Sequence, residues 1–173
     1  MKQQNRLELS DNLTGQQIQD DFRHSRVVSL DLWHLRINKG NEAYYLNDPV
    51  KALRYFKQAL EIADNLLLLS IQQGSNPAAA LTAMSQSLRN LTEIYLSYDL
   101  PEEAISAREA FFYLLVEIAP ETFYKNTSFS GAYLSAIDQE LDLLLTLYYA
   151  IGAEQDVIST AMITAQNVRH TEY

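Results

Sequence analysis

The side chains that could carry out chemistry are few in this sequence, and they do not form a catalytic set. Its three histidines, His24, His34 and His170, lack the Glu-x-x-His spacing that a carboxylate-bridged metal site in a helical bundle requires. His24 follows Asp20 by one helical turn, which is typical of an exposed helical pair. The chain has no cysteine, no glycine-rich phosphate loop and no Gly-x-Ser-x-Gly motif. The sequence therefore predicts no enzyme, no bound metal and no cofactor.

The distribution of charge favours a protein partner over nucleic acid. The formal net charge is −9, and residues 91–173 hold 13 Asp and Glu but only 3 Lys and Arg. This acidic half repels a phosphate backbone and attracts a basic segment of a partner. Lys51, Arg54 and Lys57 form a basic stripe, which is either a solvated helix face or a surface for head-to-tail self-association with the acidic half. We predict a protein partner with a basic segment.

The elements that must position these groups are helices. With 5 Gly and 4 Pro, the chain has too few turn residues for an all-β protein, and apolar residues recur at intervals of three and four. Asp48–Pro49 and Asn76–Pro77 predict helix starts, and Gly152 predicts a turn. A helix that starts after Pro101, with Glu102 and Glu103 in its first turn, is expected to end at Pro120. Residues 121–130 are then expected to form a loop, followed by helices over about 131–150 and 154–168.

We expect a single all-α domain of six or seven helices, arranged as a stacked superhelix or a compact bundle. The expected segments are a flexible stretch over 1–13, a leading helix from Thr14, and hairpins over about 28–72, 77–119 and 131–168. No signal peptide or apolar run of about 18 residues occurs, so we predict a cytoplasmic protein without membrane insertion. LLLLS (66–70) and FFYLLVEIA (111–119) are apolar nearly all round and predict burial on more than one side, for which a homodimer is one route.

The hairpin is repeated. GNEAYYLNDPVKALRYFKQAL (40–60) aligns with 92–112 and 145–165, with offsets of 52 and 53 residues. The first copy resembles the tetratricopeptide repeat. The positions that are small in that family hold Gly40, Ala52 and Ala59, and its aromatic position holds Phe56. The second copy has Thr92 and Arg108 at two of these positions. The spacing exceeds the 34-residue repeat of that family by about 18 residues, which predicts unusually tall hairpins.

The resemblance implies a partner-binding face on the first helix of each hairpin. In the tetratricopeptide family this face holds a peptide or helix of another protein. The positions carried over are His34, Ile37, Asn41, Tyr44, Tyr45, Arg89, Glu93, Asp142, Thr146 and Tyr149, together with Gln86, Leu96, Ser97, Gln139 and Ala150. Tyrosine and arginine are also the residue types that interfaces favour. The carboxylate clamp of some family members is expected to be absent, because Ile37 stands where its lysine would be.

These observations predict a non-enzymatic adaptor or chaperone-like protein that receives a partner peptide or helix between its hairpins. The alternative is a small regulatory sensor whose tall hairpins enclose a peptide or other small ligand. An enzyme is the third class. The sequence holds no nucleophile, base and orienting group at spacings that would bring them into one site, which argues against this class.

Overall fold

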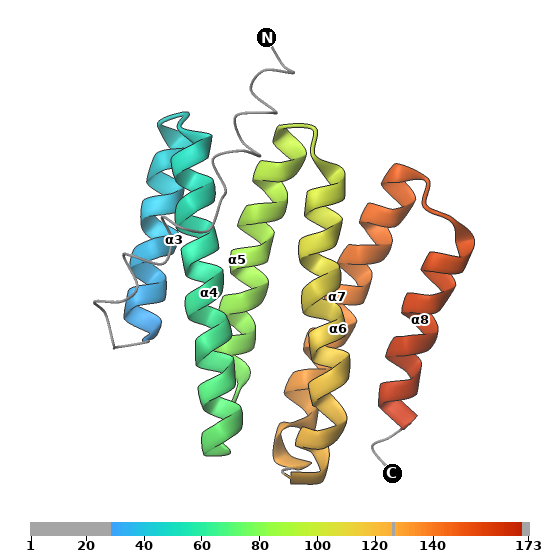
Figure 1. The fold of residues 1–173 in the computed structure, drawn as a ribbon. Helices are drawn as coiled ribbons and strands as arrows, with labels where there is room; N and C mark the ends of the chain where they lie inside the picture. The colour runs from blue at the N-terminus through green and yellow to red at the C-terminus, as the bar shows by residue number, and fades with distance from the viewer. Residues whose placement is uncertain (1–28, 126, 171–173) are drawn as a thin grey trace.

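The computed structural model describes residues 29–125 and 127–170, which fold into three helical hairpins (Figure 1). The helices are α3 (Leu30–Tyr45), α4 (Pro49–Gln73), α5 (Ala78–Ser97), α6 (Pro101–Lys125), α7 (Ser130–Ile151) and α8 (Gln155–His170), and a short 3₁₀ turn, η1 (Thr127–Phe129), precedes α7. No strand occurs in these residues, so the all-α prediction is confirmed. The segment 1–13 and the leading helix expected from Thr14 lie outside the described residues.

The helices form two layers. In one layer α5 packs between α3 and α7, and in the other α6 packs against α8. The three hairpin turns lie at one end of the molecule, so that α4 and α6 begin at this end and α5 runs in the opposite direction between them (Figure 1). Two of the helices, α4 and α6, have 25 residues each, which corresponds to a length of about 37 Å. The hairpins are therefore tall, as the repeat spacing predicted.

The three hairpin turns close in the same way, as does the end of α4 at Gly74 and Ser75. In each turn a backbone amide donates to a carbonyl five residues earlier at 2.9 Å: Asp48 to Ala43, Leu100 to Tyr95, and Ala153 to Tyr148. The residue before each donor has a left-handed backbone: Asn47 (φ 57°), Asp99 (φ 61°) and Gly152 (φ 69°). This is the Schellman motif that satisfies the last carbonyls of a helix. The Asp48 side chain then accepts from the Lys51 amide at 3.1 Å, as the predicted N-cap of α4.

The first hairpin is held together where α3 crosses α4. A Cβ atom placed on Gly40 would lie 2.3 Å from Cε1 of Phe56, whose ring is buried, so only glycine permits this approach. Ala52 and Ala59 are fully buried on the same helix as Phe56, in agreement with the small residues expected there. The next hairpin is joined to this one by Trp33, whose Nε1 donates to Oγ of Ser87 at 2.9 Å.

One prediction about local structure is wrong. Helix α6 does not end at Pro120 but continues to Lys125, so most of the predicted loop over 121–130 is helix or 3₁₀ turn. Proline removes one backbone hydrogen bond, and the turn that precedes it is anchored by Leu115 and Ala119, which are completely buried. Thr122 Oγ1 also donates to the Ile118 carbonyl at 2.9 Å.

Burial of LLLLS on several sides is not reached within the described residues of the single chain, and its burial through a homodimer stays a prediction. Leu67 is buried at 1% exposure, whereas Leu68 and Leu69 are 47% and 38% exposed. In the second segment Phe111, Phe112, Leu115 and Ala119 are buried and Tyr113 is exposed. Burial on several sides thus applies to the middle of α6, which lies between α5 and α7, but not to this part of α4.

Candidate ligand-binding groove

The residues predicted from the resemblance lie on the layer formed by α3, α5 and α7. Some of them lie together and line two hollows in this layer. Asn41, Tyr44, Tyr45 and Glu93 line a hollow of about 220 Å³ between α3 and α5. Arg89 lines a second one, of about 310 Å³ between α5 and α7, with Gln86 and Gln139. Both hollows are small.

The other predicted residues do not join these hollows. His34 is exposed beside Trp33, with ring centroids 4.6 Å apart. Asp142, Thr146 and Tyr149 are exposed along α7, where the Thr146 hydroxyl donates to the carbonyl of Asp142 in its own helix. Ile37 is buried at 3% exposure, because it faces the helices of its own hairpin, and it contributes to the core rather than to a surface.

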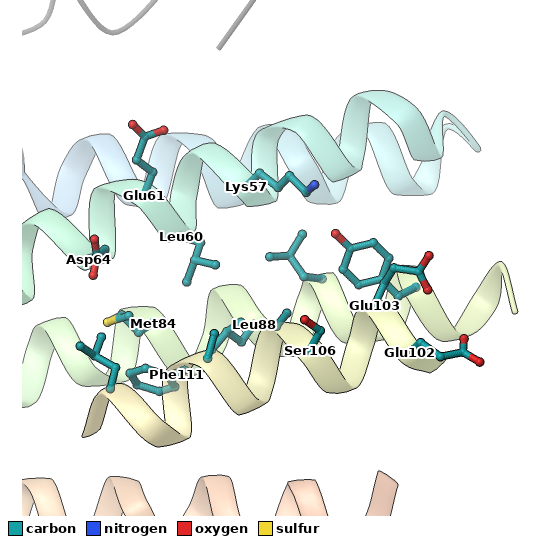
Figure 2. A pocket seen from close by; sticks show the side chains of 15 residues that line it. Lys57, Leu60, Glu61, Asp64, Met84, Leu88, Glu102, Glu103, Ser106 and Phe111 are labelled. Carbon is teal, nitrogen blue, oxygen red and sulfur yellow. The ribbon is translucent and has the colours of Figure 1, made fainter. Parts of the chain in front are cut away.

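A larger groove of about 760 Å³ lies on the opposite side of α5, between α4 and α6 (Figure 2). Its floor is provided by Met84, Leu88, Leu91 and Tyr95, which recur at three- and four-residue spacing along α5. Arg89 and Glu93 lie on the other side of the same helix. We call this site the α4–α6 groove.

The rims of the α4–α6 groove combine apolar and charged side chains. On the α4 side, Leu60 points toward α6 in Figure 2, and the charged members of this rim are Lys57, Glu61 and Asp64. On the α6 side, carboxylates occur at the first turn and are followed by small and apolar residues: Glu102, Glu103, Ser106, Ala107, Ala110, Phe111 and Leu114. Four carboxylates and one ammonium therefore surround an apolar floor.

Partial burial changes the acidity of the groups along the α4 rim. Burial, and then the negative charge of Asp64, raise the pKa of the Glu61 carboxyl, and burial also raises the pKa of Asp64. Burial lowers the pKa of the Lys57 ammonium, which lies 6.0 Å from the centroid of the Tyr95 ring. The fold thus holds two like-charged carboxylates about one turn apart, where partial burial disfavours the ionised form of both and the charge of Asp64 further disfavours that of Glu61.

Comparison with known proteins places the chain in a family. Residues 31–164 match the family model described as protein of unknown function (DUF2753). The chain belongs to the DUF2753 family. No curated protein and no solved structure matches it. The matched segment contains every residue that lines the α4–α6 groove of this DUF2753 protein.

A buried polar cluster of the DUF2753 chain lies behind the groove, and the sequence analysis missed it. The Arg108 guanidinium donates from Nη1 to Glu140 Oε2 at 2.6 Å and from Nε to Thr92 Oγ1 at 3.1 Å. The Ser85 hydroxyl donates to the other Glu140 oxygen at 3.0 Å. Arg108 and Glu140 are 2% and 0% exposed, so the pair is desolvated on all sides. These contacts join α5, α6 and α7.

The sequence carried a signal for this cluster. Arg108 and Thr92 occupy the repeat positions that hold Phe56 and Gly40 in the first hairpin. A hydrogen bond between two polar side chains thus replaces the contact between a ring and a glycine at the same crossing. An arginine at a buried repeat position predicts a buried acid on a neighbouring helix, because an unpaired charge in the core is strongly unfavourable.

Two kinds of site are absent from the described part of this DUF2753 protein. No group of three or more His, Asp or Glu side chains among residues 29–125 and 127–170 is placed to hold a metal ion. Over the same ranges, no helix has the length and apolar character needed to span a bilayer.

Proposed function

We propose that this DUF2753 protein is a non-enzymatic interaction module whose α4–α6 groove receives an amphipathic helix with basic residues from a partner protein. One observation carries the proposal: an apolar floor and four rim carboxylates, Glu61, Asp64, Glu102 and Glu103, occur in the same groove. An apolar helix face fits the floor, and lysines or arginines at its borders fit the rims. We place the activity in the cytoplasm as part of the same proposal, because a chain without cysteines needs no oxidising compartment.

The shape of the groove supports a helix as the occupant. The α6 rim presents Ser106, Ala107 and Ala110, which are small and allow close approach of a neighbouring helix axis. Ser106 and Ala110 are exposed, so this approach is open from the solvent side. The resemblance of the first hairpin to the tetratricopeptide repeat is a second line of support, although that resemblance implied a site on the other layer.

The energetic cost of the rim carboxylates also supports a ligand. Glu61 and Asp64 carry raised pKa values, so their ionised forms are less favourable in the folded chain than in the unfolded chain. Groups that are held at such a cost cluster at functional sites. A cationic ligand relieves the cost because it supplies the missing opposite charge.

The proposal is tested with a synthetic amphipathic peptide of about 18 residues, which spans about 27 Å as a helix, with leucines on one face and lysines at both borders. We expect it to bind in a fluorescence anisotropy titration, more weakly as salt increases. The Ala110→Trp variant fills the groove from an exposed position and is expected to weaken binding at least about tenfold. Ala79→Trp, an exposed helical alanine outside the groove, is the matched control and should bind normally.

Two results would contradict the proposal. A peptide with glutamates in place of the lysines should not bind, and equal binding of both peptides would show that the rim charges do not select the ligand. Unchanged binding by Ala110→Trp would place the site elsewhere. If Ala150→Trp, on α7, abolished binding instead, the layer of α3, α5 and α7 would be the binding face.

Acidification is expected to release the peptide. The cationic peptide requires ionised Glu61 and Asp64, whose raised pKa values mean that they take up protons at a higher pH than ordinary carboxyl groups. Affinity should therefore be greatest near pH 7 and fall as pH decreases toward the carboxyl range. Glu61→Gln with Asp64→Asn should bind more weakly at pH 7 and flatten this profile.

The same double variant separates binding from stability. A carboxyl whose folded-state pKa is raised makes folding less favourable as pH rises through that pKa. Removal of the two charges should therefore leave the unfolding temperature at pH 7 unchanged or higher, while affinity falls. A lower unfolding temperature would show that the carboxylates serve the fold.

A sensor for a small ligand is the second candidate, and the groove volume favours it. About 760 Å³ lies within the range of small-molecule sites, roughly 300–1,000 Å³. The same charges would then select an amphiphilic amine. Binding of dodecylamine below its micelle concentration, measured by titration calorimetry, without any binding of the peptide would favour this candidate over a helix.

A further inference from the structure

We propose that the bound helix runs antiparallel to α4 and α6, with its carboxyl end beside Lys57 at the end of the groove nearest the hairpin turns. This direction rests on the proposed function, because it has meaning only if the α4–α6 groove receives a helix. It adds a prediction about the partner: which end of its helix carries which charges.

The polarity of the two rim helices is the first argument. Both α4 and α6 begin at the end of the molecule where the hairpin turns lie (Figure 1). The amino ends of both helices therefore flank the same end of the groove; in α6 the first-turn carboxylates Glu102 and Glu103 offset the partial positive charge, whereas the first turn of α4 holds no acidic residue. A third helix between them is favoured when its carboxyl end, with its partial negative charge, lies at this end.

Lys57 is the second argument. Its side chain lies on the α4 rim and extends toward the Glu103 end of the groove (Figure 2). Among the described residues no carboxylate forms an ion pair with it, and its ammonium lies over the Tyr95 ring. A half-buried ammonium without an anion is a suitable partner for the free carbonyl groups of the last turn of a helix.

The positions of the carboxylates are the third argument. Glu61 and Asp64 lie four and seven residues beyond Lys57, about 6 and 11 Å farther along α4. Asp64 faces the earlier turns of an antiparallel ligand, and Glu61, whose carboxylate points away from α6 in Figure 2, adds negative charge to the same stretch of the rim. Glu102 and Glu103 lie on the other rim at the Lys57 end, where they face the last turn of the ligand. Basic residues in that last turn also stabilise the ligand helix itself.

Disulfide trapping tests the direction, and the lack of cysteine makes each introduced thiol unique. Val50 and Leu68 are 44% and 47% exposed, and they lie 7 residues before and 11 after Lys57. Since both intervals are close to whole helical turns, both residues lie on the Lys57 side of α4, one near each end of the groove. Val50→Cys and Leu68→Cys are each mixed with the basic peptide described above, carrying one cysteine at its amino or carboxyl end.

The expected result is a crossed pattern. The peptide with a carboxyl-terminal cysteine should trap Val50→Cys, and the peptide with an amino-terminal cysteine should trap Leu68→Cys, each with a preference of at least about tenfold in rate. Lys57→Met should reduce this preference and Lys57→Arg should retain it. The opposite pattern overturns the direction but leaves the proposed function intact. Equal trapping at both ends does the same, provided that Ala110→Trp still weakens binding of the peptide. Absence of groove binding by the peptide overturns both.

Discussion

Arg108→Met is expected to destabilise the protein by about 3–5 kcal/mol, because it leaves the Glu140 carboxylate buried without its cation. The methionine fills much of the same space, so a large cavity does not explain the loss. For a domain of this size the unfolding temperature should fall by roughly 10 °C. Urea unfolding followed by circular dichroism measures the change directly.

The matched control removes both charges. Arg108→Met combined with Glu140→Leu should be within about 1–2 kcal/mol of the parent protein or more stable than it, because a buried ion pair gains little over apolar residues of similar volume. The hydroxyl groups of Thr92 and Ser85, which lose these partners, can turn to carbonyls of their own helix. A double variant as unstable as the single one would show that the pair itself, rather than the unpaired acid, accounts for the stability.

Phe56→Ala should cost about 3–5 kcal/mol, since the ring is 2% exposed and fills the crossing of α3 and α4. It should also reverse the effect of a second substitution. In the parent protein Gly40→Ala places a methyl group against the ring, and overpacking of about 1–3 kcal/mol exceeds the gain in helix propensity of about 1 kcal/mol. On the Phe56→Ala background only the gain remains.

A double-mutant cycle over Gly40 and Phe56 therefore yields a coupling energy of at least about 1 kcal/mol. Thermal unfolding of the four proteins is sufficient for the measurement. Additive effects of the two substitutions would show that the ring does not restrict position 40. In the second hairpin Thr92 stands at the position of Gly40, and Thr92→Ala should be less costly than Phe56→Ala because it removes one hydroxyl contact and leaves the ion pair in place.

The fold could be predicted from the sequence because its helix boundaries depend on local chemistry. Asp48 with Pro49 combines an N-cap acceptor with a backbone angle suited to the first helical residue, and Gly152 can adopt the left-handed backbone of the turn. The predicted helix end at Pro120 is wrong because tertiary contacts extend the helix. A proline near a helix end weakens the helix by a limited amount, and the contacts of Leu115 and Ala119 with the core outweigh it.

The candidate site could not be predicted in the same way. The resemblance directed attention to Asn41, Tyr44, Tyr45 and Glu93, which do lie together. The α4–α6 groove depends instead on how far apart two non-consecutive helices lie, and no periodicity within either helix encodes that distance. Its rims also combine residues from positions 57–64 and 102–114, whose proximity requires the complete packing of two hairpins.

The three equivalent turns have a consequence for how this protein could diversify. Because α4 and α6 start from the same turn geometry, the backbone enters both helices in the same conformation. A substitution one helical turn farther along either rim moves a charge by about 5 Å without changing any backbone contact. If the groove receives the proposed helix, related proteins could therefore select ligands with a different spacing of charges through rim substitutions alone, while the hairpin turns stay unchanged.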